Sequence, residues 1–230
     1  MIDMDCPLCK KKISRLDEEI EGRCDICTKI GMINCRCADG HQFCKECTEN
    51  LIRARVKQIC KASTAKNPYC VLEESFKDDI IASRFLKNHI LVGSALATAY
   101  NNCLKEKIDL EPVLDEIMRR GALIPPKACG HAGDCGAAVS AGIFYSVITD
   151  THPLTPGEQW GEVAILTGTC LVDLGKIGGP RCCNRGTMVA MRNSVQQVKE
   201  KLGVEMEWKD IKCRHKDWNK NCKGETCPYF

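Results

Sequence analysis

The sequence contains no long hydrophobic run, no repeat of fixed period and no large excess of one charge. Its longest uncharged runs, Ile90–Leu104 and Cys135–Thr149, have fifteen residues each, whereas a membrane-spanning helix needs about 20. The opening residues, MIDMDCPLCKKK, are charged and contain cysteines, unlike the apolar core of a secretory signal. These absences predict a soluble, cytoplasmic protein with no membrane contact.

The small net charge of +3 is unevenly distributed along the chain. Residues 1–70 hold 13 Lys and Arg against 10 Asp and Glu, and residues 209–230 hold 6 against 3. The segment 53–66 contains a run of basic residues that predicts a helix or linker able to bind nucleic acid or an acidic protein. An ordinary solvated surface is the favoured explanation, because such small imbalances are common on protein surfaces. The basic residues of this segment are Arg53, Arg55, Lys57, Lys61 and Lys66.

What the chain does have is cysteine, nineteen in all. In a reducing compartment, cysteines at CxxC spacing indicate metal ligands or reactive thiols rather than disulfides. They form two groups, one at metal-ligand spacing before residue 48 and one scattered after Cys129.

The first group predicts two structural zinc ions. Three CxxC pairs and an interposed Cys/His pair supply eight ligands, which are enough for two closed tetrahedral sites. Two pairings are open. A sequential pairing, which we favour, puts the first four ligands on one ion and the last four on the other. An interleaved pairing, as in a RING finger, joins the first pair to Cys37 and His41 and the second pair to the remaining two cysteines. A RING that starts at Cys24 lacks a closing CxxC after Cys47. In chain order the ligands are Cys6, Cys9, Cys24, Cys27, Cys37, His41, Cys44 and Cys47.

The rest of the chain predicts helices. Apolar periodicity indicates helices over 76–85, 90–105, 111–120, 135–148, about 156–176 and 181–202. Thr155 is expected to cap the fifth of these helices, and Gly203 is expected to end the last. Residues 123–133 are expected to form a loop, and a short strand is possible near 204–208. The predicted architecture is therefore mostly α: a zinc-binding module over 1–50, a basic helix or linker over 51–71, and a cysteine-containing helical domain over 72–230.

The second cysteine group surrounds two glycine-rich loops that each lead into a helix. The first loop contains Cys129, His131 and Cys135, and the second contains Cys182 and Cys183. Free N–H groups and the helix dipole at such a helix start stabilise a thiolate. The tail adds three cysteines, of which we include Cys222 and Cys227 in the predicted site.

Three mechanisms suit these residues. An iron–sulfur cluster needs three or four thiolates, which Cys129, Cys135, Cys182 or Cys183, and Cys222 or Cys227 would supply. A nucleophilic or redox thiol needs one cysteine and a base, for which Cys135 or Cys182 with His131 would serve. A third zinc ion needs four of the same ligands. Burial in a packed core is the simpler explanation for mid-helix cysteines such as Cys103 and Cys170.

The runs PKACGHAGDCGAAVSAGIF and GGPRCCNR, followed by a terminal CPYF, resemble a domain of unknown function found in archaea and anaerobic bacteria. In that family a cysteine-rich N-terminal ribbon often precedes the helical domain, and some members lie beside radical-SAM or methyltransferase modules. The resemblance implies a metal-binding protein of sulfur or redox metabolism but no defined reaction. The alternative is a non-catalytic adaptor whose zinc module binds nucleic acid or protein.

Overall fold

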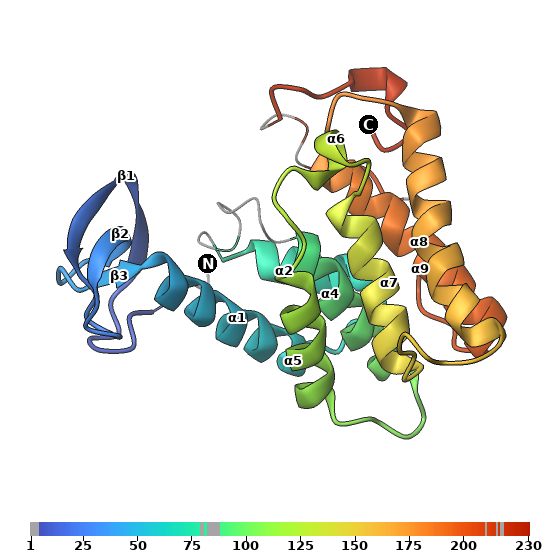
Figure 1. Cartoon of the computed structure of the whole chain (residues 1–230), viewed down its shortest axis with the longest axis horizontal. Coiled ribbons are helices and arrows are strands. Elements are labelled where there is room, and N and C mark those ends of the chain that lie inside the picture. Colours follow the sequence, from blue (N-terminus) through green and yellow to red (C-terminus); the bar gives the residue numbers. More distant parts are fainter. Residues whose placement is uncertain (1–4, 79–80, 82–87, 210, 215, 217–218) are drawn as a thin grey trace. The chain divides into compact units, whose positions relative to one another are not determined.

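The computed structural model describes residues 5–78, 81, 88–209, 211–214, 216 and 219–230 (Figure 1). The chain divides into two compact units. The first comprises residues 1–62 and 73–84, and the second comprises residues 63–72 and 85–230. Each unit is described below by itself.

The first unit contains a three-stranded antiparallel sheet in the order β1-β2-β3, followed by a helix. The strands are β1 (Ile13–Arg23), β2 (Ile30–Cys37) and β3 (Gln42–Cys44), and the helix is α1 (Lys45–Ala62). The apolar stripe of α1 consists of Ile52, Val56 and Cys60, which recur every four residues and are buried. Thr48 fixes the start of α1 against β2, because its hydroxyl donates to Asn34 Oδ1 at 3.0 Å.

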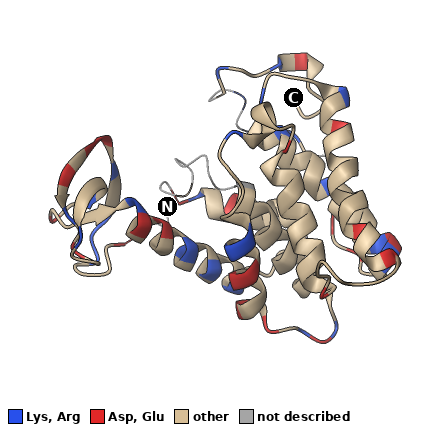
Figure 2. Cartoon of the chain, in the orientation of Figure 1, with Lys and Arg blue, Asp and Glu red and all other residues tan. Residues whose placement is uncertain are grey.

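The helical unit is built around α7 (Gly136–Ile148), which packs against four other helices. These neighbours are α4 (Asn88–Cys103), α5 (Leu110–Gly121), α8 (Glu158–Ile177) and α9 (Cys183–Leu202). Neither α4 nor α7 contains a Lys, Arg, Asp or Glu, whereas β1 and α1 carry many (Figure 2). A helix without charge on any face is typical of a buried core position.

The other elements with described bounds are short. They are α2 (Pro68–Phe76), α6 (Ala128–His131) and a 3₁₀ turn, η3 (Gly224–Thr226). The described residues between Gly203 and the end of the chain are mostly irregular. No helix in the described part of the chain is both long and apolar enough to cross a membrane.

The prediction of a mostly α protein is confirmed, and the sheet is confined to the first unit. Four predicted helices match α4, α5, α7 and α9 closely, and Gly203 ends α9 in the left-handed conformation with φ 66°. Short strands could not be read from the first fifty residues, because the cysteines and charges there obscure the alternation of apolar and polar residues.

Several local predictions were wrong. Gly157, with φ 78°, caps α8 in place of Thr155, whose hydroxyl instead accepts from the His152 N–H. Residues 204–208 form no strand. Within 123–133, expected to be a loop, α6 forms one short turn of helix. The predicted helix over 76–85 lies mostly outside the described residues, and α2 ends where that helix was expected to begin.

Candidate metal centres

Two groups of four side chains in the first unit bring their ligand atoms within 4.8 Å of one another. One group is Cys6, Cys9, Cys37 and His41. The other is Cys24, Cys27, Cys44 and Cys47. All eight predicted ligands are therefore assembled into two groups that are able to hold metal ions.

The two CxxC turns at the start of these groups have the same geometry. In each, the residue after the second cysteine is left-handed, Lys10 and Thr28 both having φ 61°. In each, that residue's N–H donates to the carbonyl of the first cysteine, at 2.9 Å for Lys10 and 2.8 Å for Thr28. The turn folds back on itself and points both thiols to one side, as a metal knuckle requires.

The spacing between the sulfur atoms suits a tetrahedral ion. The Sγ atoms of Cys9 and Cys37 lie 3.6 Å apart, and those of Cys27 and Cys44 lie 3.8 Å apart. An ion bound at about 2.3 Å from each thiolate separates the sulfurs by about 3.8 Å. In the first group, His41 presents Nδ1, which lies 3.3 Å from Cys37 Sγ.

Each group contains one thiol that ionises easily. Burial raises the pKa of Cys24, but backbone N–H groups of Cys27, Cys44 and Ile26 outweigh it and bring the pKa to about 6. For Cys37, burial is likewise outweighed, here by hydrogen bonds from Cys9 and His41, and the pKa falls to about 7. Convergent donors of this kind stabilise the thiolate that a metal needs.

The sequential pairing favoured from the sequence is wrong, because the structure interleaves the ligands. The apparent lack of a closing CxxC is also explained. The interleaved pattern begins at Cys6 rather than at Cys24, so it is complete at Cys47. Spacing alone could not decide the pairing, since both arrangements use the same four pairs.

The basic segment that follows is partly committed to packing. Arg55 pairs with the buried carboxylate of Asp78, at 3.4 Å. Arg53 and Lys57 are half-buried, whereas Lys61 is exposed. Arg53, Lys57 and Lys61 recur every four residues along α1 and so lie on one face of the helix.

In the helical unit, the two predicted glycine loops meet at one cavity of 690 Å³. Four cysteines line it, and Arg181 lies beside them. The thiols also interact electrostatically. Burial is the largest cause that raises the pKa of Cys183, and negative charge on Cys135, Cys182 or Cys129 raises it further. The four are Cys129, Cys135, Cys182 and Cys183.

The sequence did not identify His89, which also lines this cavity. Its Nδ1 lies 3.2 Å from the Ile124 carbonyl and donates to it, which leaves Nε2 as the acceptor. Burial lowers the pKa of His89, so the ring is neutral. The ring fits there because residue 136 is glycine: a Cβ at Gly136 would lie 2.0 Å from His89 Cδ2.

The predicted pairing of a thiol with His131 gains no support from the geometry. His131 is exposed at the end of α6 and does not line the cavity. The helix starts also do not lower the pKa of Cys135 or of Cys183 as expected. Burial raises the pKa of Cys135, and the backbone N–H groups of Ala138 and Ala137 offset this only in part.

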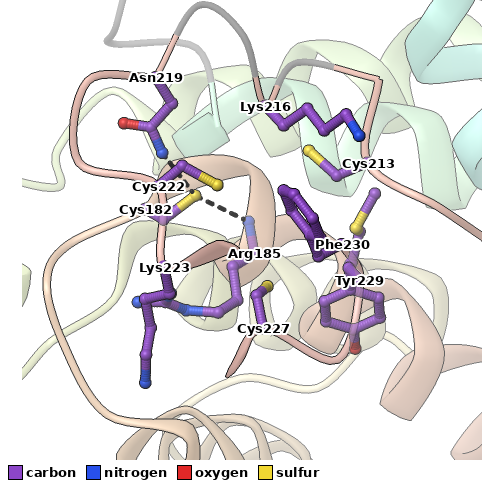
Figure 3. A pocket seen from close by; sticks show the side chains of 11 residues that line it. Cys182, Arg185, Cys213, Lys216, Asn219, Cys222, Lys223, Cys227, Tyr229 and Phe230 are labelled. Atoms are coloured by element: carbon purple, nitrogen blue, oxygen red, sulfur yellow. Dashed lines mark hydrogen bonds between the residues drawn. The ribbon is translucent and has the colours of Figure 1, made fainter. Parts of the chain in front are cut away.

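The tail cysteines line a separate small cavity of 20 Å³, together with Cys182 (Figure 3). This cavity includes Cys213, which the predicted site left out, beside Cys222 and Cys227. Cys182 Sγ accepts from Asn219 Nδ2 at 3.5 Å, so this sulfur points toward the tail. The predicted ligands thus line two cavities, which share Cys182 and Arg185. Among the described residues of the helical unit, no three ligand atoms lie within 4.8 Å of one another.

Comparison with known proteins gives a family for the helical part of the chain. No curated protein and no solved structure gives a significant match. The model of a family of unknown function, DUF5714, matches residues 56–230, which include every cysteine of the two helical-unit cavities. The match leaves out residues 1–55, so the expected resemblance over the cysteine-rich N-terminal module is not found. The chain belongs to the DUF5714 family of unknown function.

Proposed function

We propose that this chain is a metalloprotein in which two zinc ions build the N-terminal module and an iron–sulfur cluster occupies the large cavity of the helical unit. Zinc is the proposed metal of the first unit because each group supplies four ligands, most of them cysteines, and four such ligands suit a closed tetrahedral zinc site. Closed sites of this kind stabilise a fold and leave no position for substrate.

The cluster proposal rests on one observation: cysteines from two separate loops line one 690 Å³ cavity. Cys129, Cys135 and Cys183 supply three thiolates, the soft ligands that iron–sulfur clusters require. Their sulfurs are spaced more widely than the two N-terminal groups. A cavity of 690 Å³ has room for a cluster, which distributes its thiolates over several irons.

The environment supports a negatively charged group. Arg181 and Lys127 line the cavity. Arg185 is buried at 5% exposure and donates to the carbonyls of Gly178 and Pro180, which holds the second glycine loop against α9. Three thiolates leave one iron of a four-iron cluster without a cysteine, and His89 Nε2 lies at the same cavity. A small ligand entering there would meet an iron atom, a neutral imidazole and cationic groups.

The test is metal and sulfide analysis of the full chain purified without oxygen. We expect about four iron and four sulfide per chain, in addition to zinc. Cys129→Ser and Cys183→Ser should each abolish iron and sulfide and leave zinc unchanged. Cys70→Ser is the matched control, because Cys70 is an exposed cysteine outside both cavities. Zinc without iron in the wild-type protein would reject the cluster.

A protein-binding adaptor is the second candidate, and a specific feature favours it. Ile30 and Met32, on one face of β2, are 80% and 51% exposed. The knuckle residues Leu8 and Ile26 of the same unit are also exposed. Apolar side chains exposed together on so small a module are typical of a protein interface. If the metal analysis finds zinc alone, this alternative becomes the leading one.

A further inference from the structure

The four cysteines around the small tail cavity are separate from those proposed to hold the cluster. Cys182 contributes from the start of α9, and the other three come from the irregular tail. Cys182 is the extended N-cap of α9, whereas Cys183 is its first helical residue. Cys182 lines both cavities, and its sulfur accepts from Asn219 Nδ2 of the tail at 3.5 Å, which places it at the smaller one.

From this arrangement we infer a third structural metal site, a single zinc ion held by Cys182, Cys213, Cys222 and Cys227. Four thiolates around one ion form a closed site of the type that staples a fold. In Figure 3 these four side chains surround the cavity, together with Arg185, Lys216 and Lys223.

The size of the cavity selects a single ion over a cluster. Its 20 Å³ accommodates about one water-sized sphere, whereas the other cavity measures 690 Å³. The tail sulfurs are spaced more widely than those of the N-terminal groups, so binding draws them inward. Cys222 is exposed and lies in an irregular segment, which allows this closure.

The charges around the cavity complement such a site. Four thiolates and one divalent ion leave two negative charges. Lys216, Lys223 and the buried guanidinium of Arg185 line the same cavity, and Arg185 Nε has no hydrogen-bond partner. Cations that line the cavity offset the net charge of a tetrathiolate site.

The tail also needs an interaction that holds it in place. From Gly203 to Phe230 the described residues bury few large apolar side chains, chiefly Met206 and Tyr229. The Cys213 N–H donates to the Tyr229 carbonyl at 2.6 Å, which brings the middle of the segment to its end. A long irregular segment without a core of its own is usually held by ligands or remains disordered.

The experiment is zinc analysis of the full chain and its variants. We expect about three zinc ions per chain, and about two after Cys227→Ser or after the conservative change at the exposed position, Cys222→Ser. Cys70→Ser should retain three. Trypsin cleavage at Lys212, Lys220 and Lys223 should accelerate at least tenfold in the two tail variants. A wild-type protein with two zinc ions per chain, or tail variants that lose no zinc, would overturn the proposed site.

The sharpest test compares variants of the two consecutive cysteines. The iron measurement in this test rests on the proposed cluster. Cys182→Ser should lose one zinc and keep iron, whereas Cys183→Ser should lose iron and keep zinc. The two proposals fail separately: zinc at three without iron rejects the cluster alone, and iron with zinc at two rejects the tail site alone. Loss of iron from Cys227→Ser would mean that the tail ligates the cluster, and would also overturn the separate site.

Discussion

The two units of this protein form their interiors from different materials. In the first unit, the buried cluster consists of Cys24, Ile33 and Cys47, with Leu16, Cys27 and Cys44 packed against it. Four of these six residues belong to the second metal group. The first unit also buries Phe43 and Ile13. The helical unit completely buries a larger set of big side chains, among them Phe144, Tyr145, Leu96, Leu114 and Leu166. The comparison teaches that the same residue type, cysteine, forms part of the buried interior in one unit and lines cavities in the other.

The largest expected effect follows from breaking one N-terminal metal group. Cys37→Ala should remove at least one metal and unfold the first unit, because structural zinc contributes about 10–16 kcal/mol to folding in small modules. Hydrogen exchange should show lost protection of β1–β3 amides, with the amides of α4 and α7 unchanged.

The control lies two residues away on the same strand. Cys35 is buried but belongs to neither metal group, so Cys35→Ala should keep both metals and most of the amide protection. Equal loss in the two variants would mean that packing, rather than metal, holds the first unit.

The second effect tests the helical core. Phe144 is fully buried on α7 and packs edge-on against Tyr100, with ring centroids 6.1 Å apart. Phe144→Ala should lower the free energy of unfolding by about 3–5 kcal/mol without loss of N-terminal zinc, as measured by denaturant unfolding.

The exposed control for this prediction is Ile165→Ala on α8, where the side chain is 62% exposed. It should change stability by no more than about 0.5 kcal/mol. If Phe144→Ala also released the N-terminal zinc, the two units would not be independent in stability.

A smaller effect is expected where α7 approaches His89. Gly136→Ala should lower the free energy of unfolding by about 1–3 kcal/mol, because the new methyl group displaces the imidazole of His89 or shifts the helix. Gly168→Ala on α8 has no atom within 4 Å of the added methyl, and should instead stabilise its helix by up to about 1 kcal/mol. Thermal unfolding of both variants would measure the difference. A neutral Gly136→Ala would show that the His89 ring has room to move.

The smallest effect concerns the surface of α5. Hydrogen bonds from Arg119 and Arg120 hold the pKa of Glu116 at about 2, below its ordinary value. The pairing stabilises the fold above the unfolded pKa, and this contribution is lost as pH falls from about 5 toward 2. Glu116→Gln should therefore cost a few tenths to about 1 kcal/mol at pH 7.

Unfolding measured at pH 7 and at pH 2.5 would check the sign of this effect. The difference in free energy of unfolding between the wild-type protein and Glu116→Gln should be smaller at pH 2.5 than at pH 7. A difference that grows as the pH falls would contradict the assigned pairing.

The sequence predicted elements where one local signal dominates. The uncharged run of α4 and the amphipathic run of α5 are such signals, as is Gly203, which adopts the left-handed conformation that ends a helix. The eight N-terminal ligands were identifiable for the same reason, since CxxC spacing is a local property.

What the sequence could not provide depends on long-range placement. The pairing of the knuckles depends on the β1–β2 register, in which Ile13 faces Cys37. His89 lies in the first turn of α4 and carries no motif, so only the packing of α4 against α7 brings it to the cavity. Whether Cys182 and Cys183 serve different sites depends on where the tail folds back onto the helical unit. No rule of residue spacing predicts that position.

The interleaving of the two N-terminal metal groups has a consequence for synthesis on the ribosome. A sequential arrangement would complete its first site at residue 27, well before its second. Here the first site is complete at His41 and the second at Cys47, only six residues later. At about 5–20 residues per second, both sites become available within about a second of each other. The nascent module therefore has no stage at which one ion can be captured long before the other, and its eight ligands remain reduced and unbound until nearly all of it has been translated.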